Sequence, residues 1–295
     1  MKMSQLSTIV ECTPAVLARL FLVSAILAFT QNAAAQGVAP GVPVATVLHL
    51  PQQHDWTIGV GVALISAPAF SGSSTQSYSF YPDLRLSYKD AVFASIPDGL
   101  GWNAFNRNSW KLGPLVKWRF GRQEKSGGSI FLISGRTDAL VGMGDIAAAQ
   151  EAGGFAQYSW RGIRGRVELR RGFGGHQGVV GDVLIDYSGD VGPIYYGGGV
   201  RATFADDRFT NVYYGVNGAQ SAATGLAPFH TTGGLVSSGL TGFLLLPVSS
   251  RAGVTLFGGY DVLGKVVTAS SLIQTRGQND QLYLGLGFDM RFGIH

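Results

Sequence analysis

Hydrophobic and polar residues alternate along most of the chain between Trp56 and Phe292. The alternation is clearest near the C-terminus, where one parity holds only apolar residues and the other only polar or small ones: Leu282, Leu284, Leu286, Phe288, Met290 and Phe292 against Gln281, Tyr283, Gly285, Gly287, Asp289 and Arg291. Because successive side chains of a β-strand point to opposite faces, this pattern predicts a strand with one apolar and one polar face.

A second segment, 163–170, places four charges on a single face. Arg164, Arg166, Glu168 and Arg170 alternate there with Ile163, Gly165, Val167 and Leu169. The following predicted strand carries Asp182 and Asp186 on its polar face, and the preceding one carries Glu151 and Gln157. Since side chains opposite one another on neighbouring strands interact, we expect charge pairs across these strands.

Alternating segments of about ten residues, separated by turn residues, are typical of a transmembrane β-barrel. Hydrocarbon offers no hydrogen-bond partner, so a sheet in a bilayer must close on itself to pair its backbone groups. We therefore predict an all-β fold, a transmembrane antiparallel up-and-down barrel of about twelve strands within a range of ten to fourteen. The expected strands lie near 56–67, 77–88, 91–105, 110–120, 147–160, 163–172, 178–188, 194–204, 210–217, 231–246, 251–263 and 279–292.

In such a barrel the polar parity faces the lumen and the apolar parity faces lipid. The predicted lumen cluster is Arg164, Arg166, Glu168, Arg170, Asp182 and Asp186. These charges would either tune the ion selectivity of an open channel or pair with one another and fill the lumen, and we favour the filled lumen. Short turns such as that between Trp160 and Ile163 are expected on the periplasmic side, whereas the links 121–145 and 217–230 need not share one side.

A water-facing β-sandwich is the alternative to a barrel. Three features weigh against it: unbroken apolar faces, an export leader, and aromatic residues near strand ends, where an interfacial girdle would place them. Those aromatic residues are Trp56, Tyr88, Trp110, Tyr158, Trp160, Tyr187, Tyr196 and Phe292.

The N-terminus has the pattern of a secretory signal peptide. Lys2 and Arg19 precede the apolar run 20–29, and small residues lead to an expected cleavage between Ala35 and Gln36. The apolar run is shorter than the ~20 residues that span a bilayer, which disfavours the alternative of a signal anchor. The expected organisation is thus a cleaved signal peptide (1–35), a flexible segment (36–55) and an outer-membrane barrel (56–295).

Composition narrows the functional classes. Charged residues make up 14% of the chain and the formal net charge is only +4, which argues against a nucleic-acid binder. The single cysteine, Cys12, lies in the leader, so the mature chain has no disulfide or thiolate metal site.

Candidate catalytic residues are sparse. His176 and His230, with Ser188, Ser221, Ser237 or Ser238, are the residues that a barrel lipase or deacylase would use, but no G-x-S-x-G segment is present. We interpret both histidines as solvated loop residues. No cluster of histidines suggests a metal, and we expect no catalytic residue, metal or cofactor.

The segment Tyr213-Tyr214-Gly215-Val216, followed by Ser221, Leu226 and Phe229, resembles the MipA/OmpV family of outer-membrane proteins. The resemblance extends over 113–122, 140–155 and 260–292, nearly the whole mature chain. Two departures are Leu263-Gly264-Lys265-Val266-Val267, where the family often has Leu-x-Gly-Asp-Ala, and the three residues that follow Phe292.

The resemblance implies a non-enzymatic barrel in the outer membrane. It implies that the strand bearing Tyr283, Phe288, Met290 and Phe292 is read by the barrel-assembly machinery. It also implies a scaffold that contacts outer-membrane lipid and brings a murein transglycosylase together with a murein synthase, without nucleic acid. A small-solute channel is the alternative function, and a lipid-modifying enzyme is a third.

Overall fold

The structure, a computed structural model, describes residues 55–127 and 131–294. The predicted signal peptide (1–35) and all but the last residue of the segment 36–55 lie outside the described residues. The strands are β1 (Trp56–Pro68), β2 (Gln76–Tyr88), β3 (Val92–Ser95), β4 (Gly99–Trp102), β5 (Phe105–Arg107), β6 (Trp110–Arg119), β7 (Leu132–Ser134), β8 (Ala149–Trp160), β9 (Ile163–Gly174), β10 (Val179–Val191), β11 (Ile194–Ala205), β12 (Gly234–Pro247), β13 (Ala252–Leu263) and β14 (Asp280–Ile294). The helices are α2 (Asp207–Tyr214), α3 (Gly218–Thr224), α4 (Lys265–Thr268) and α5 (Ser271–Arg276).

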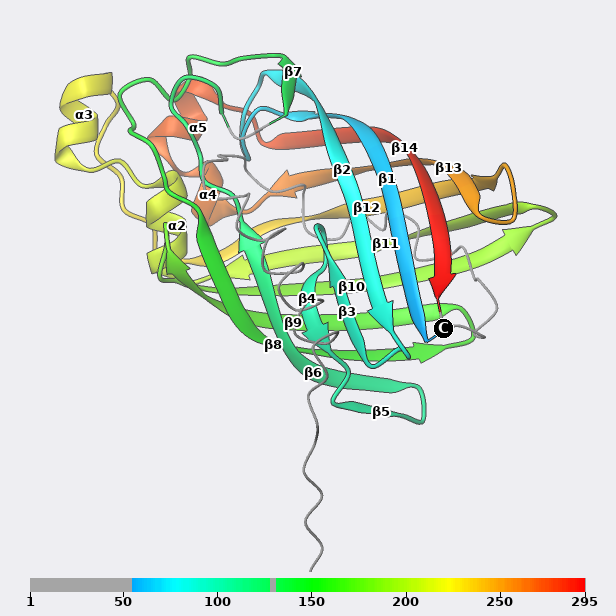
Figure 1. The fold of residues 1–295 in the computed structure, drawn as a ribbon. Coiled ribbons are helices and arrows are strands. Elements are labelled where there is room, and N and C mark those ends of the chain that lie inside the picture. Colours follow the sequence, from blue (N-terminus) through cyan, green and yellow to red (C-terminus); the bar gives the residue numbers. More distant parts are fainter. Residues whose placement is uncertain (1–54, 128–130, 295) are drawn as a thin grey trace, which may run out of the picture. The chain divides into compact units, whose positions relative to one another are not determined.

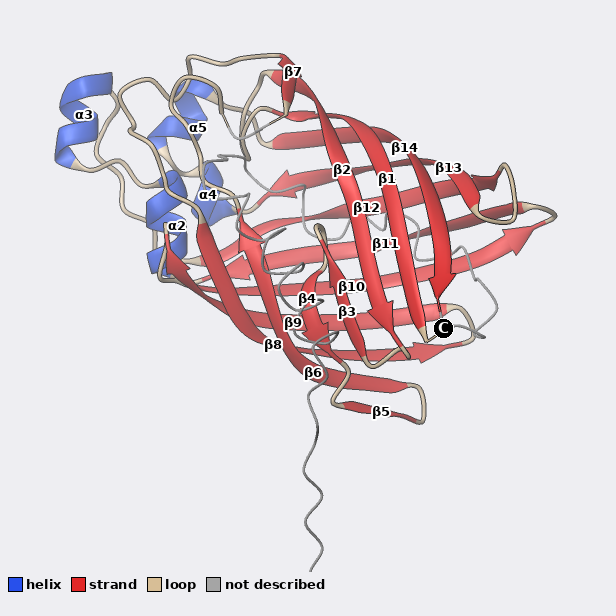
Figure 2. Cartoon of the chain, in the orientation of Figure 1, coloured by secondary structure: helices blue, strands red, loops and turns tan. Residues whose placement is uncertain are grey.

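The strands form a closed antiparallel barrel (Figures 1 and 2). Closure comes from β1, which pairs with β2 on one side and with β14 on the other. Twelve strands make the wall, because β5 only continues β4 along β6 and β7 is a short addition to β2. The predicted fold class and strand number are thus confirmed.

The expected and observed numbers of strands agree because two differences between the expected and observed strands cancel. The expected strand 91–105 is wrong, because β3 and β4 form a short hairpin with its turn at 96–98. The expected strand 210–217 is also wrong, because most of this segment is helix α2. Its composition of aromatic and β-branched residues favours a strand, but Asp206 caps a helix by accepting a hydrogen bond from the N–H of Phe209.

The two ends of the barrel differ in their connections. The short turns 89–91, 108–109, 161–162, 192–193 and 248–251 lie at one end, here called the short-turn rim, where β1 also starts and β14 finishes. Positive φ at both central residues, 51° and 69° at Asn108 and Ser109 and 48° and 83° at Arg161 and Gly162, matches the tight two-residue turn that follows the strand twist. All eight aromatic residues of the expected girdle lie toward this rim.

The long connections gather at the opposite end, as Figure 2 shows for the helices. The links 121–145 and 217–230, whose relative placement the sequence left open, both belong to this end. Here α2, α4 and α5 pack with the β1–β2 and β6–β8 connections around a buried apolar cluster that includes Phe70, Leu140, Phe209, Val267 and Leu272. This cluster, here called the plug, closes the helical end of the barrel.

The outer surface of the barrel is apolar. On β14, Leu282, Leu284, Leu286, Phe288, Met290 and Phe292 are between 38% and 52% exposed, whereas their inward neighbours Gln281, Tyr283, Asp289 and Arg291 are buried. Exposed hydrophobic side chains recur on the other long strands, including Val62, Val167, Ile185, Leu240 and Leu256. An outward-facing apolar band of this kind is typical of a transmembrane barrel.

Candidate functional site: the charged lumen

The inward face of β9 carries the charges that the alternation predicts. Arg170 is 2% exposed and Glu168 is 6% exposed, whereas the intervening Leu169 is 62% exposed on the outer surface. The parity of the strand therefore sends charged and apolar side chains to opposite sides of the barrel wall. All six residues of the expected cluster project inward from β9 and β10.

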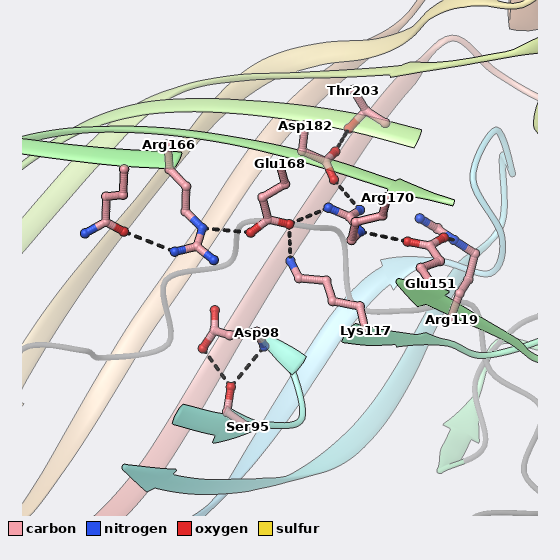
Figure 3. Close-up of polar contacts among 11 residues, drawn as sticks. Ser95, Asp98, Lys117, Arg119, Glu151, Arg166, Glu168, Arg170, Asp182 and Thr203 are labelled. Carbon is pink, nitrogen blue, oxygen red and sulfur yellow. Dashed lines mark hydrogen bonds and ion pairs between the residues drawn. The ribbon is translucent and has the colours of Figure 1, made fainter. Parts of the chain in front are cut away.

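Arg170 is the centre of the lumen network (Figure 3). Its guanidinium donates to Glu151 at 2.9 Å, to Asp182 at 2.5 Å and to Glu168. The three carboxylates come from β8, β10 and β9 itself, so one side chain links three neighbouring strands. Because each buried charge has partners of opposite sign, the desolvation cost of burying the group is offset.

Glu168 joins this centre to the rest of the lumen. Lys117 on β6 lies 2.8 Å from Glu168, and the Nε of Arg166 donates to it at 2.7 Å. Arg166 also donates to Gln157 at 3.1 Å and stacks over the ring of Phe155 at 4.1 Å. Figure 3 shows the polar contacts as a chain along the inner wall, between residues of the neighbouring strands β6, β8, β9 and β10.

Three further groups of charges line the wall. Arg164 pairs with Asp186 directly across β9 and β10, with 2.6 Å between Nη2 and Oδ2. Arg201 forms two hydrogen bonds to Asp261, at 2.9 and 2.5 Å. Arg85 donates to Asp83 and, at 3.1 Å, to Asp98 in the β3–β4 turn.

Several of these residues lie outside the predicted cluster. Arg85, Lys117 and Arg119 lie on the polar parity of their strands, so the alternation pattern contains a signal for them. Asp98 lies in a turn that the sequence reads as part of a strand, and no periodic signal identifies it.

His176 joins the lumen network to the plug, and our expectation that it is solvated is wrong. It lies between β9 and β10 as predicted but is only 2% exposed, with Nε2 3.0 Å from Glu151. Its ring packs edge-on against Phe209 of α2 at 5.0 Å between centroids. Arg119 also contacts both Glu151 and the Phe209 ring. The plug provides the burial, which the glycine-rich turn alone does not indicate.

Inside the plug, Arg122 has no carboxylate partner among the described residues. Its Nη1 donates to the carbonyl of Tyr213 at 2.6 Å, while its Nε and Nη2 are buried without a hydrogen bond. Burial lowers the pKa of Arg122 to about 10 and raises that of Tyr213 to about 12. The Tyr214 hydroxyl, which donates to Ser71 at 2.8 Å, also has its pKa raised by burial.

The family-like segment forms much of this plug. Tyr213, Tyr214, Val216 and Leu226 are buried members of its apolar cluster, and Phe229 packs against them. Two backbone hydrogen bonds of 2.9 Å join Val216 to Phe229. The residues that carry the resemblance therefore close the helical end of the barrel.

The other residues singled out in the sequence lie outside the charged cluster of β9 and β10. Tyr283 faces the lumen and bonds to Thr241 at 3.0 Å, whereas Phe288, Met290 and Phe292 face outward. Their recognition by an assembly machinery stays a prediction. His230 is exposed, as expected, and Ser221 donates to the Leu226 carbonyl rather than to a histidine. Within 55–127 and 131–294, no group of residues has the composition of a metal site.

Helices do not provide a membrane span in the described part of the chain. All of its helices are too short and too polar to cross a bilayer.

A cavity of about 320 Å³ occupies the part of the lumen between the ion network and the short-turn rim. Asp90 and Lys111 line it near the rim, and Glu168, Asp182 and Arg201 line it deeper in the barrel. Beyond these residues, Arg170 and Glu151 are 2% and 1% exposed. The cavity is therefore a blind pocket that ends at the ion network.

Comparison with known proteins finds one matching family model and several similar structures. A family model described as "MltA-interacting protein MipA" matches residues 60–292, and no curated protein matches. Among solved structures, an outer-membrane channel from Pseudomonas putida F1 is similar with 13% identity, a TM-score of 0.41 and coverage of 85% of this chain and 100% of that one. The NanC porin has 8% identity, a TM-score of 0.38 and coverage of 80% and 98%.

Proposed function

The chain belongs to the MipA family, and on that premise we propose that it is a non-conducting outer-membrane scaffold whose short-turn rim binds a murein transglycosylase. The proposal follows the description of the family as interacting with MltA. A murein synthase is the second partner that we propose, because a scaffold of this kind acts by holding two enzymes together.

The closed lumen is the main support for the proposal that the barrel does not conduct solutes. Arg170 and Glu151 have side chains 1% exposed and join at 2.9 Å, and the plug lies directly behind them. A solute would have to separate these buried charges before it could pass, which costs several kcal/mol per ion. A barrel closed in this way serves better as a platform than as a pore.

The short-turn rim is the surface that we propose for the partner. Short turns of outer-membrane barrels face the periplasm, where murein enzymes work. Arg107, Arg161 and Arg251 are exposed there and make no ion pair within the described chain. Charges at the edge of an interface steer association, so a partner with an acidic contact surface would be favoured.

Binding measurements on the intact barrel test the proposal. The protein is placed in nanodiscs, and binding of a purified murein transglycosylase of the same organism is measured by biolayer interferometry. We expect the triple variant Arg107→Glu, Arg161→Glu and Arg251→Glu to bind at least tenfold more weakly than the unmodified chain.

The matched control is Arg208→Glu, an exposed arginine on α2 at the opposite end. It should leave binding unchanged. Failure of the unmodified chain to bind the transglycosylase, or equal weakening by the control, would contradict the proposed surface.

Planar-bilayer recording tests the alternative of a small-solute channel. We expect no stepwise conductance from the unmodified barrel at low salt. Regular openings whose ion selectivity changes in Arg166→Glu would instead favour a channel.

A further inference from the structure

We propose that the blind pocket of the lumen binds a small organic anion of monosaccharide size, held through a carboxylate or phosphate group. The pocket volume of about 320 Å³ lies at the lower end of the range for small-molecule sites, roughly 300–1,000 Å³. The inference concerns the lumen alone and does not depend on the partner proposed for the rim.

The charge of the pocket wall favours an anion. Seven basic residues line it: Arg85, Lys111, Lys117, Arg164, Arg166, Arg201 and Arg291. Only four carboxylates line it: Asp90, Asp98, Glu168 and Asp182. The partners Asp186 and Asp261 do not line the pocket. Several cationic groups thus reach the cavity while their counterions stay further back.

The hydrogen bonds made by the arginines of the pocket also favour an anionic ligand. Arg85 uses Nε and Nη1 for Asp83 and Asp98, and its Nη2 is buried without a partner. Arg166 uses Nε for Glu168 and Nη1 for Gln157, and no partner within the described chain takes its Nη2. A guanidinium has five N–H donors, so Arg166 keeps a donor for a ligand, whereas the unused Nη2 of Arg85 is buried in the wall.

The acceptors of the pocket are already occupied. Glu168 accepts from Lys117, Arg166 and Arg170. Asp182 accepts from Arg170 and, at 2.7 Å, from the Thr203 hydroxyl. A wall with spare donors and occupied acceptors suits a ligand rich in acceptors, and guanidinium groups bind carboxylate and phosphate through paired hydrogen bonds.

Neutral side chains suggest that the rest of the ligand carries hydroxyl groups. Thr57, Ser87, Asn103 and Gln157 line the same pocket. Hydroxyl and amide groups can both donate and accept, so they match a polyhydroxylated body better than an apolar one.

Probes of one ring size and different charge test the proposal. Glucuronate, glucose 6-phosphate, glucose and glucosamine are titrated by calorimetry into the full barrel in detergent micelles. We expect at least one of the two anions to bind at least tenfold more tightly than glucose, and glucosamine to bind no more tightly than glucose. The preferred anion tells whether carboxylate or phosphate is recognised.

Single substitutions test whether the anion binds in the lumen pocket. Arg166→Gln should weaken the anion at least tenfold, while Glu168 keeps Lys117 and Arg170 as partners. If this variant does not fold, Lys111→Gln near the mouth provides the test with an expected weakening of about threefold. Arg251→Gln at the outer rim removes the same charge away from the pocket and should change nothing.

Three results would overturn the inference. The first is that neither anion binds. The second is that glucose or glucosamine binds as tightly as the anions do. The third is that Arg251→Gln weakens anion binding as much as Arg166→Gln does.

Discussion

Arg170 and Glu151 lie on adjacent strands, with side chains 1% exposed, and the Nε of Arg170 donates to Glu151 at 2.9 Å. Glu151 also contacts Arg119 and His176. This pair therefore ties β8 and β9 to the plug at the point where the lumen is closed. The stability of the barrel and the closure of its lumen depend on the same contact.

Loss of Arg170 should strongly destabilise the fold. Arg170→Met leaves Asp182 without an ion pair and removes one partner each from Glu151 and Glu168. We expect the free energy of unfolding in lipid vesicles to fall by about 3–5 kcal/mol, the usual cost of leaving a buried charge unpaired. The control Arg164→Met, on the same strand, breaks a more exposed pair and should cost about 1 kcal/mol or less. Equal losses would contradict the central role of Arg170.

A charge on the outer face should cost more at mid-strand than near the rim. Leu286 lies at the middle of β14 and Phe292 near its end, and both side chains are exposed. Leu286→Arg should lower the unfolding free energy by about 2–4 kcal/mol, whereas Phe292→Arg should lower it by about 0–1 kcal/mol. Denaturant titration in vesicles measures both. A water-soluble barrel would tolerate the two substitutions equally.

The cap of α2 should contribute measurably to stability. Asp206→Ala removes the side-chain oxygen that accepts from the Phe209 N–H at 3.0 Å. We expect a loss of about 1 kcal/mol, seen as faster hydrogen exchange in α2. Asn217→Ala removes the equivalent cap of α3. Because α3 buries no residue, that variant should leave the exchange of α2 unchanged, and an equal effect would show that capping is not the cause.

The two neighbouring tyrosines of α2 should respond differently to loss of the hydroxyl. Tyr213 buries a hydroxyl without a hydrogen-bond partner, so Tyr213→Phe should leave stability at pH 7 unchanged or raise it. Tyr214→Phe removes the hydrogen bond to Ser71 and should cost about 1 kcal/mol. Thermal unfolding of both variants checks the order, and a larger loss in Tyr213→Phe would contradict it.

Alkaline pH should weaken the fold through Tyr213. Burial raises its pKa to about 12 in the folded chain, whereas an unfolded tyrosine titrates near pH 10. The unfolded state therefore binds fewer protons between pH 10 and 12, and stability from this group falls as pH rises through that window. Tyr213→Phe should lose less stability across it than the unmodified chain.

Arg122 acts in the opposite direction over the same range. Burial lowers its pKa to about 10, so the folded state loses its proton first and stability from this group rises with pH. Both chains in the comparison keep Arg122, so the difference between them reports mainly Tyr213. Identical pH profiles would contradict the assignment.

The sequence by itself determined the barrel and the direction of its charges. Parity is a local property: once residues such as Leu169 and Arg170 lie on one strand, they must point to opposite faces. The apolar outer band and the inward position of Arg164, Glu168 and Asp182 follow from that rule, whereas the expected strand number agrees with the structure only because the split of 91–105 offsets the helix at 210–217. The sequence motif from Tyr213 to Phe229 also indicated the family, and the matching family model confirms this resemblance.

The tertiary structure alone decided the plug. Helix α2 has the composition of a strand, but its side chains pack against Leu140, Val267 and Leu272, residues distant in sequence that only the closed barrel brings together. The same packing buries His176, which a glycine-rich turn would otherwise expose. Local alternation has a period of two and contains no information on contacts between loops, so the closure of the lumen and its blind pocket emerged only with the fold.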